Sequence, residues 1–178
     1  MACRWLSVLS ASLLVTDAPP FNVIFVCMGN ICRSPMAAAV LRTQLEAAGV
    51  RHVQVSSAGT GGWHVGDPAD RRARAALERR GYPTDHEAQQ FKREWFDEYQ
   101  LIIAMDDDNV RELRRLAPTR DQPKQVRLML EFDDSAESLD VPDPYYGSAA
   151  DFDVVLTQIE DACTGLVSAL QTTGLKLA

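Results

Sequence analysis

One short stretch combines a thiol, two flexible backbone positions and a guanidinium, and it reads Cys27-Met28-Gly29-Asn30-Ile31-Cys32-Arg33-Ser34. A thiolate is a strong nucleophile, and the planar fork of arginine holds two phosphate oxygens at once, which lysine cannot imitate. Gly29 and Asn30 tolerate the positive φ that a loop wrapped around an anion requires. We therefore predict that Cys27 attacks phosphorus and that Arg33 holds the phosphate oxygens. The remaining residues of the stretch are predicted to contact the substrate, namely Met28, Gly29, Asn30, Ile31, Cys32 and Ser34.

The flanking sequence predicts that this stretch is a loop between a strand and a helix. The run 21–26 is short, apolar and β-rich, and Ser34 suits the N-cap of a helix over 35–48 that opens with a proline. Backbone N–H groups converge at a helix start, which suits a phosphate, and the helix dipole together with Arg33 favours the thiolate of Cys27. The alternative is a buried cysteine beside a solvated arginine. A nucleotide-binding Walker loop is excluded, because no Gly-Lys-Ser/Thr follows.

A second segment supplies a proton donor, and it reads Asp143-Pro144-Tyr145-Tyr146-Gly147. Cleavage of an aryl phosphate expels a phenolate whose conjugate acid has a pKa of about 10, so fast cleavage needs an acid. We predict that Asp143 is this acid, since prolines on either side stiffen its loop. Tyr145 and Tyr146 are then placed to flank an aromatic ring, with Trp63 from a glycine-rich stretch as the facing wall.

These side chains also have plainer explanations. Asp143 lies among other acidic residues and could be solvated loop charge, and the two tyrosines could pack in the core. Three aspartates at positions 106–108 follow a predicted strand. They could bind a cation, but capping the next helix is the favoured interpretation.

Predicted strands and helices alternate along the chain. Strands are predicted over 21–26, 53–55, 101–105 and 125–128, and helices over 35–48, 67–80, 94–98, 107–116 and 149–170, with an acidic loop over 133–146. This alternation predicts a single α/β domain with a parallel sheet and helices on both faces. Ligands bind such sheets at the carboxyl ends of the strands, where the Cys27 loop starts.

The composition argues against several classes of function. The 178 residues are 46% hydrophobic and 24% charged, as in a soluble globular domain, and the net charge of -7 argues against binding to nucleic acid or to an anionic membrane. Four cysteines and three histidines stand at no metal-ligand spacing, so no metal is expected. The apolar run 5–15 is a weak signal-like segment too short to cross a bilayer. We expect a non-core extension over 1–20 and a cytoplasmic protein, with export by a route other than a signal peptide left open.

With these motifs the sequence closely resembles the low-molecular-weight protein tyrosine phosphatases, in particular their actinobacterial branch. The resemblance runs from Phe21 to Leu170 and includes residues 25–37, 57–60, 63–66, 81–86 and 143–147. It implies a flavodoxin-like fold with four parallel strands, and a phosphotyrosine-containing protein or peptide as substrate. It further implies a cysteinyl-phosphate intermediate and no cofactor. We expect one phosphatase domain over 21–172, a tail over 173–178, and a monomer or weak dimer.

The resemblance also assigns roles to residues around the nucleophile. In this family the residue at Asn30 shapes the loop through hydrogen bonds, and Ser57 and His86 fall at the positions that support it. His86 is therefore expected to be a scaffold residue and not a catalyst. Cys32 matches a second loop cysteine that in some members pairs with the nucleophile during oxidation.

Four alternative functions stay open. An arsenate reductase of the same fold needs further resolving cysteines, and only Cys163 follows Cys32. A phosphoarginine phosphatase is weakly disfavoured by Ile31 in the loop. A catalytically inactive phosphotyrosine-binding module would release no phosphate. A redox sensor based on Cys27 and Cys32 would form a disulfide without turning over phosphate.

Overall fold

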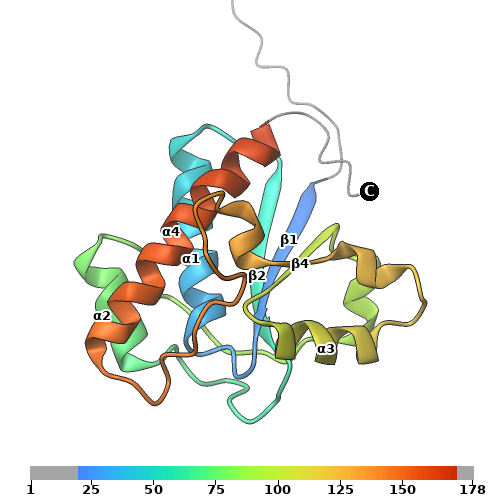
Figure 1. Cartoon of the computed structure of the whole chain (residues 1–178), viewed down its shortest axis with the longest axis horizontal. Coiled ribbons are helices and arrows are strands. Elements are labelled where there is room, and N and C mark those ends of the chain that lie inside the picture. The colour runs from blue at the N-terminus through green and yellow to red at the C-terminus, as the bar shows by residue number, and fades with distance from the viewer. Residues whose placement is uncertain (1–19, 172–178) are drawn as a thin grey trace, which may run out of the picture.

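Four parallel strands form the centre of the molecule in the computed structural model, which describes residues 20–171 (Figure 1). They lie in the order β2-β1-β3-β4, and their bounds are β1 (Phe21–Cys27), β2 (Val53–Gly59), β3 (Leu101–Ala104) and β4 (Val126–Leu128). The predicted fold class, an α/β domain with a four-stranded parallel sheet, is confirmed. The expected tail over 173–178 lies outside the described residues, and so does the expected extension over 1–20 apart from Pro20.

Helices cover both faces of this sheet. One side carries α1 (Arg33–Ala47), α2 (Arg71–Arg79) and α4 (Ala149–Gln171), and the other carries α3 (Asp107–Leu116) (Figure 1). Three short 3-10 helices complete the described chain, namely η1 (Arg93–Asp97), η2 (Gln122–Gln125) and η3 (Met129–Phe132). Within residues 20–171, no helix is long and apolar enough to cross a membrane.

The apolar run of β1 serves both layers of the core. Val23 and Phe25 join the core shared with α1, α2 and α4, whereas Ile24 and Val26 join the core shared with α3. Successive side chains of a strand point to opposite faces of the sheet. A central strand covered by helices on both sides must therefore be apolar at every position, as β1 is.

The strand order places a crevice at the carboxyl end of β1. The chain passes from β1 to β2 on one side, whereas β3 pairs with β1 on the other side. Connections that leave in opposite directions leave room for a ligand at such a switch point. Cys27 ends β1 at this edge, and Asp106 follows shortly after β3.

The start of α1 differs from its prediction. The helix begins at Arg33 with Cys32 at the N-cap position, and no side chain caps it. The predicted N-cap role of Ser34 is wrong because its hydroxyl is engaged with Cys27 and Asn30 on the loop side. The Ser34 hydroxyl thus takes part in the hydrogen bonds around the thiol and does not cap α1.

The start of α2 lies later than predicted. The helix begins at Arg71, and Asp70 is its N-cap, accepting from Arg72 N at 2.7 Å. Asp67 cannot open the helix because its backbone N–H donates to His64 O and its carbonyl accepts from Ala88 N, both at 2.8 Å. The segment before Asp70 is therefore fixed as a loop.

The other predicted elements lie close to the observed ones. The largest difference is in β2, predicted over 53–55, which extends to Gly59 because it pairs with β1 along its whole length. The predicted bounds of α3 agree with the structure, and the short helix predicted over 94–98 is the 3-10 helix η1.

Candidate active site

The thiol of Cys27 lies at the end of β1 and is 3% exposed. The backbone N–H of Asn30 donates to its sulfur at 3.2 Å, and Ser34 Oγ lies 3.0 Å from it. Ser34 Oγ accepts from Asn30 Nδ2 at 2.9 Å, and its own proton has two acceptors within reach, Cys27 Sγ at 3.0 Å and Ala58 O at 3.3 Å. Donors aimed at a sulfur stabilise its thiolate form.

Asn30 holds the loop in shape. It is fully buried and has a φ of 56°, the only positive φ of a non-glycine residue within 20–171. Its Nδ2 also donates to Ser57 Oγ at 3.0 Å, and its Oδ1 accepts from Gln89 N at 2.9 Å. His86 Nε2 donates to its carbonyl oxygen at 2.6 Å. The structure therefore brings Asn30, Ser57 and His86 together.

His86 is a neutral hydrogen-bond donor in this arrangement. Burial lowers the pKa of its imidazole, only partly offset by the hydrogen bond to Asn30 O. Since a carbonyl can only accept, Nε2 carries the proton of the neutral ring.

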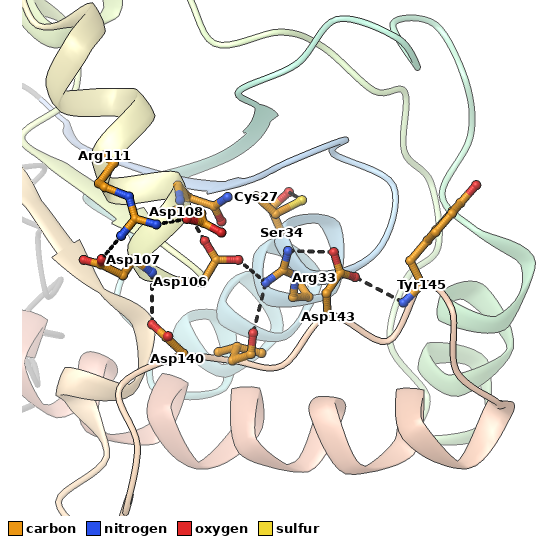
Figure 2. Close-up of polar contacts among 12 residues, drawn as sticks. Cys27, Arg33, Ser34, Asp106, Asp107, Asp108, Arg111, Asp140, Asp143 and Tyr145 are labelled. Atoms are coloured by element: carbon orange, nitrogen blue, oxygen red, sulfur yellow. Dashed lines mark hydrogen bonds and ion pairs between the residues drawn. The ribbon is translucent and has the colours of Figure 1, made fainter.

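Arg33 is buried, with 2% of its side chain exposed, and two carboxylates meet it (Figure 2). Its Nη1 donates to Asp106 Oδ2 at 2.6 Å and to Val141 O at 3.0 Å, and its Nη2 donates to Asp143 Oδ2 at 2.9 Å. Burial alone lowers the pKa of the guanidinium, but the negative groups of Cys27, Asp143 and Asp106 outweigh it, so that the pKa is raised. Arg33 is therefore a fixed positive charge beside the thiol.

A cavity of about 370 Å³ opens over the loop. Most of the predicted site residues line it, namely Cys27, Met28, Gly29, Ile31, Cys32, Arg33, Trp63, Asp143, Tyr145 and Tyr146. Asn30 and Ser34 are fully buried, and with Ser57 and His86 they support the loop. The cavity thus joins the thiol, the guanidinium and a carboxylate under one opening.

Aromatic side chains surround the mouth of this cavity. Trp63 is 75% exposed and Tyr146 is 96% exposed, and Tyr145 contacts Tyr146 edge to face. The alternative that the tyrosines pack in the core is wrong. The Trp63 ring packs against Gly61. A Cβ added at Gly61 would lie 1.8 Å from the ring, so any side chain at this position would displace Trp63.

The acidic run at 106–108 starts a helix, which was the favoured interpretation. Asp106 Oδ1 accepts from Asn109 N at 2.7 Å and caps α3, while its other oxygen binds Arg33. Asp107 and Asp108 both pair with Arg111 on the surface of α3 (Figure 2). The run therefore links a helix start to the guanidinium.

Cys32 differs from Cys27 in its surroundings. Burial, followed by the negative charge of Asp70, raises the pKa of its thiol. Among the residues that the structure describes, Cys27, Cys32 and Cys163 are free thiols. Cys32 is therefore held in its neutral thiol form.

Comparison with known proteins decides the family. The profile of the family described as "Low molecular weight phosphotyrosine protein phosphatase" matches residues 22–175. The chain belongs to this family. The predicted enzyme class, a protein-tyrosine-phosphatase, is confirmed by this membership.

Two bacterial members of the low-molecular-weight phosphatases show how far the similarity extends. The low molecular weight protein-tyrosine-phosphatase of Streptomyces coelicolor is 49% identical over 154 residues, which are 85% of this chain and 94% of the relative. The low molecular weight protein-tyrosine phosphatase A of Mycobacterium tuberculosis is 46% identical over 150 residues, 83% of this chain and 90% of the relative. The predicted resemblance to the actinobacterial branch is confirmed.

Solved structures of low-molecular-weight phosphatases share the fold. A protein tyrosine phosphatase from Entamoeba histolytica, with Hepes in its active site, has a TM-score of 0.82 at 36% identity. The aligned region covers 85% of this chain and 97% of the Entamoeba histolytica chain. YfkJ from Bacillus subtilis also has a TM-score of 0.82, at 35% identity, and covers 87% and 97% of the two chains.

Four residues of this low-molecular-weight phosphatase contribute to the site without having been predicted to do so. Asp106 binds Arg33, Gln89 binds Asn30, His64 lines the cavity, and Arg72 donates to two carbonyls of the loop after Asp143. Asp106 had a usable signal, because it follows a strand at the ligand edge. Arg72 had none, since it stands in an arginine-rich helix.

Proposed function

We propose that the chain hydrolyses phosphotyrosine in proteins or peptides through a cysteinyl-phosphate intermediate. Cys27 is the nucleophile, Arg33 holds the phosphate, and Asp143 is the general acid and then the general base. The observation that carries this proposal is that a hydrogen-bonded thiol, a buried guanidinium and a carboxylate line one cavity. We assign the activity to one domain over 21–172.

The first step forms a bond from Cys27 Sγ to phosphorus and breaks the bond from phosphorus to the phenolic oxygen. Loop N–H groups and Arg33 hold the three remaining oxygens while charge builds on them. The incoming phosphate displaces Asp143 from Nη2 of Arg33, and the freed carboxylate takes up a proton from solvent. Asp143 then gives its proton to the departing phenolic oxygen, which an aryl oxide of pKa about 10 requires.

The second step releases inorganic phosphate. Asp143, now a carboxylate, takes a proton from a water molecule as that water attacks phosphorus. The bond from sulfur to phosphorus breaks, and the sulfur leaves as a thiolate. The hydrogen bonds from Asn30 N and Ser34 Oγ stabilise that thiolate in both steps.

The shape of the site favours an aryl phosphate. Trp63, Tyr145 and Tyr146 carry exposed aromatic surface around the opening, and aromatic rings pack well against one another. A phosphoserine has no ring to fill the space between them. The printed names of the relatives as tyrosine phosphatases support the same substrate class.

The test is hydrolysis of phenyl phosphate and of a phosphotyrosine peptide in the presence of a metal chelator. We expect turnover by the wild type, none by Cys27→Ser, and a loss of about 10²–10⁴ in kcat/KM for Asp143→Ala. Asp140→Ala is the matched control, because Asp140 lies in the same loop and its carboxylate accepts from Asp107 N at 3.0 Å, not from Arg33. When turnover of a substrate labelled in its phosphate group is quenched with acid, the label should remain on the wild-type protein.

The covalent mechanism, the binding module and the redox sensor predict different results. Turnover by Cys27→Ser would contradict the covalent intermediate. A wild type that binds phosphotyrosine peptide without releasing phosphate would be a binding module. A wild type that forms a Cys27–Cys32 disulfide after peroxide treatment, yet never releases phosphate, would be a redox sensor.

A further inference from the structure

Arg72 contacts the loop that carries the proposed general acid, although it lies outside the proposed catalytic trio. Its Nη1 donates to the carbonyl oxygen of Gly147 at 2.8 Å, and its Nη2 donates to that of Tyr145 at 2.9 Å. Both carbonyls lie just beyond Asp143 in the chain. The guanidinium therefore fixes the backbone on the C-terminal side of the proposed acid.

The same side chain is anchored beside the phosphate-binding loop. Asp70 accepts from Arg72 Nε at 3.0 Å and from Nη2 at 2.9 Å. The backbone N–H of Asp70 in turn donates to the carbonyl oxygen of Ile31 at 2.7 Å. Ile31 lies in the loop between Cys27 and Arg33. A continuous chain of hydrogen bonds therefore connects the loop of the nucleophile to the loop of the acid.

Aromatic contacts restrict the guanidinium further. It lies over the ring of Phe152 at 4.6 Å from the centroid, and 6.0 Å from the ring centroid of Tyr145. A planar guanidinium can stack on a ring and serve several acceptors at fixed angles, whereas the ammonium of lysine acts as a point charge. Arg72 thus forms a rigid connection among α2, the acid loop and the start of α4.

We propose that Arg72 is a positioning residue that holds Asp143 at a fixed distance from Cys27. This inference rests on the proposed function, because Arg72 acts through Asp143. Without Arg72, Asp143 keeps its contacts to Arg33 and to Tyr145 N, but the backbone beyond it loses the connection to the phosphate loop. Proton transfer requires hydrogen-bond distance, so a displaced acid protonates the departing oxygen more slowly. Phosphate binding at Arg33 is left in place.

The experiment compares leaving groups. kcat/KM is measured for phenyl phosphate, whose oxygen needs a proton, and for an aryl phosphate of a strongly acidic phenol, whose oxygen does not. For Arg72→Gln we expect a loss of about tenfold or more with phenyl phosphate and of less than about threefold with the acidic phenol. The inhibition constant for inorganic phosphate should change little.

Arg79→Gln is the matched control, because Arg79 also joins α2 to α4, through Asp153 at 2.6 Å, and does not contact the acid loop. It should leave both substrates unchanged. In an Asp143→Ala background, Arg72→Gln should add no further loss, because two residues that act through one group are not additive. An equal loss with both substrates, or full additivity with Asp143→Ala, would overturn the proposal.

Arg72→Lys keeps the inference testable if Arg72→Gln does not fold. It retains the charge but cannot serve all the acceptors, so a smaller loss confined to phenyl phosphate supports the proposal. Wild-type kcat/KM for phenyl phosphate in this variant overturns it. The wild type and Asp143→Ala test the proposed function independently of Arg72. An inactive wild type would contradict the phosphatase activity. An Asp143→Ala variant whose kcat/KM does not depend on the leaving group would contradict the role of Asp143 as the acid.

Discussion

The guanidinium of Arg33 is buried among groups that each have a second task. Asp106 binds it with one carboxylate oxygen and caps α3 with the other, whereas Asp143 is also the proposed acid. A buried charge that loses a partner is costly. In the proposed mechanism, Asp106 therefore keeps the guanidinium compensated and oriented when Asp143 turns to the substrate.

Asp106→Asn tests this division of work. Asparagine is also a good N-cap, so α3 should persist while Arg33 loses a negative partner. We expect the free energy of unfolding to fall by about 1–3 kcal/mol and kcat/KM to fall roughly tenfold. Chemical denaturation and steady-state kinetics measure both. Asp107→Asn removes only a surface pair with Arg111, and an equal effect in that variant would contradict the assignment.

Residue types predicted much of the site, but not the contacts that tertiary packing creates. Cys27, Arg33 and Asp143 line one cavity, as their chemistry suggested. Arg72 could not be singled out, because local sequence does not distinguish it from the other arginines of its helix. The predicted cap at Ser34 failed for a related reason, since rules for helix ends do not take account of a thiol at the end of the preceding strand, 3.0 Å from the hydroxyl.

At the scale of elements, α4 depends on one glycine where it meets η3. A Cβ added at Gly165 would lie 1.9 Å from the carbonyl oxygen of Phe132, so the backbone of η3 comes too close for any side chain. Backbone cannot move aside as a flexible side chain can. The distance between α4 and η3 therefore depends on the absence of a side chain at Gly165.

Gly165→Ala should accordingly destabilise the protein, even though alanine favours helices by about 1 kcal/mol. We expect a net loss of about 1–3 kcal/mol in the free energy of unfolding, because the clash forces α4 and η3 apart. Thermal or urea unfolding checks this. Thr164→Ala, at an exposed position of the same helix, should be close to neutral. A Gly165→Ala variant of wild-type stability would show that η3 can shift freely.

Element boundaries were predictable where periodicity and capping agree, as in α3. They failed where pairing or loop contacts decide. The second half of β2 is made of small and polar residues with weak strand preference, and its pairing with β1 makes it a strand. The start of α2 was misplaced because the hydrogen bonds of Asp67 to His64 and Ala88 are not visible in local sequence.

At the scale of the whole molecule, His86 couples folding to pH. Burial lowers the pKa of its imidazole below the ordinary value of 6.5 in the folded state. The unfolded chain therefore takes up this proton at a higher pH than the folded chain. The contribution to stability is complete above about pH 6.5 and is lost as the pH falls toward the folded-state pKa.

Urea unfolding at about pH 7.5 and at about pH 5.5 measures this effect. The wild type should lose stability on acidification, and His86→Gln should lose less. His52→Gln, at an exposed position, should follow the wild type. If His86→Gln has the pH dependence of the wild type, the proton uptake belongs to other groups.

Asn30 gives the loop a property that bears on how ligands bind. Its amide and its carbonyl oxygen are tied to Ser34, Ser57, Gln89 and His86, and its backbone already has the positive φ that the turn needs. The cradle therefore exists before any anion arrives. A phosphate that enters loses its own freedom of motion but does not have to order the chain around it. The conformational entropy of the loop is therefore lost when the protein folds and not when the phosphate binds.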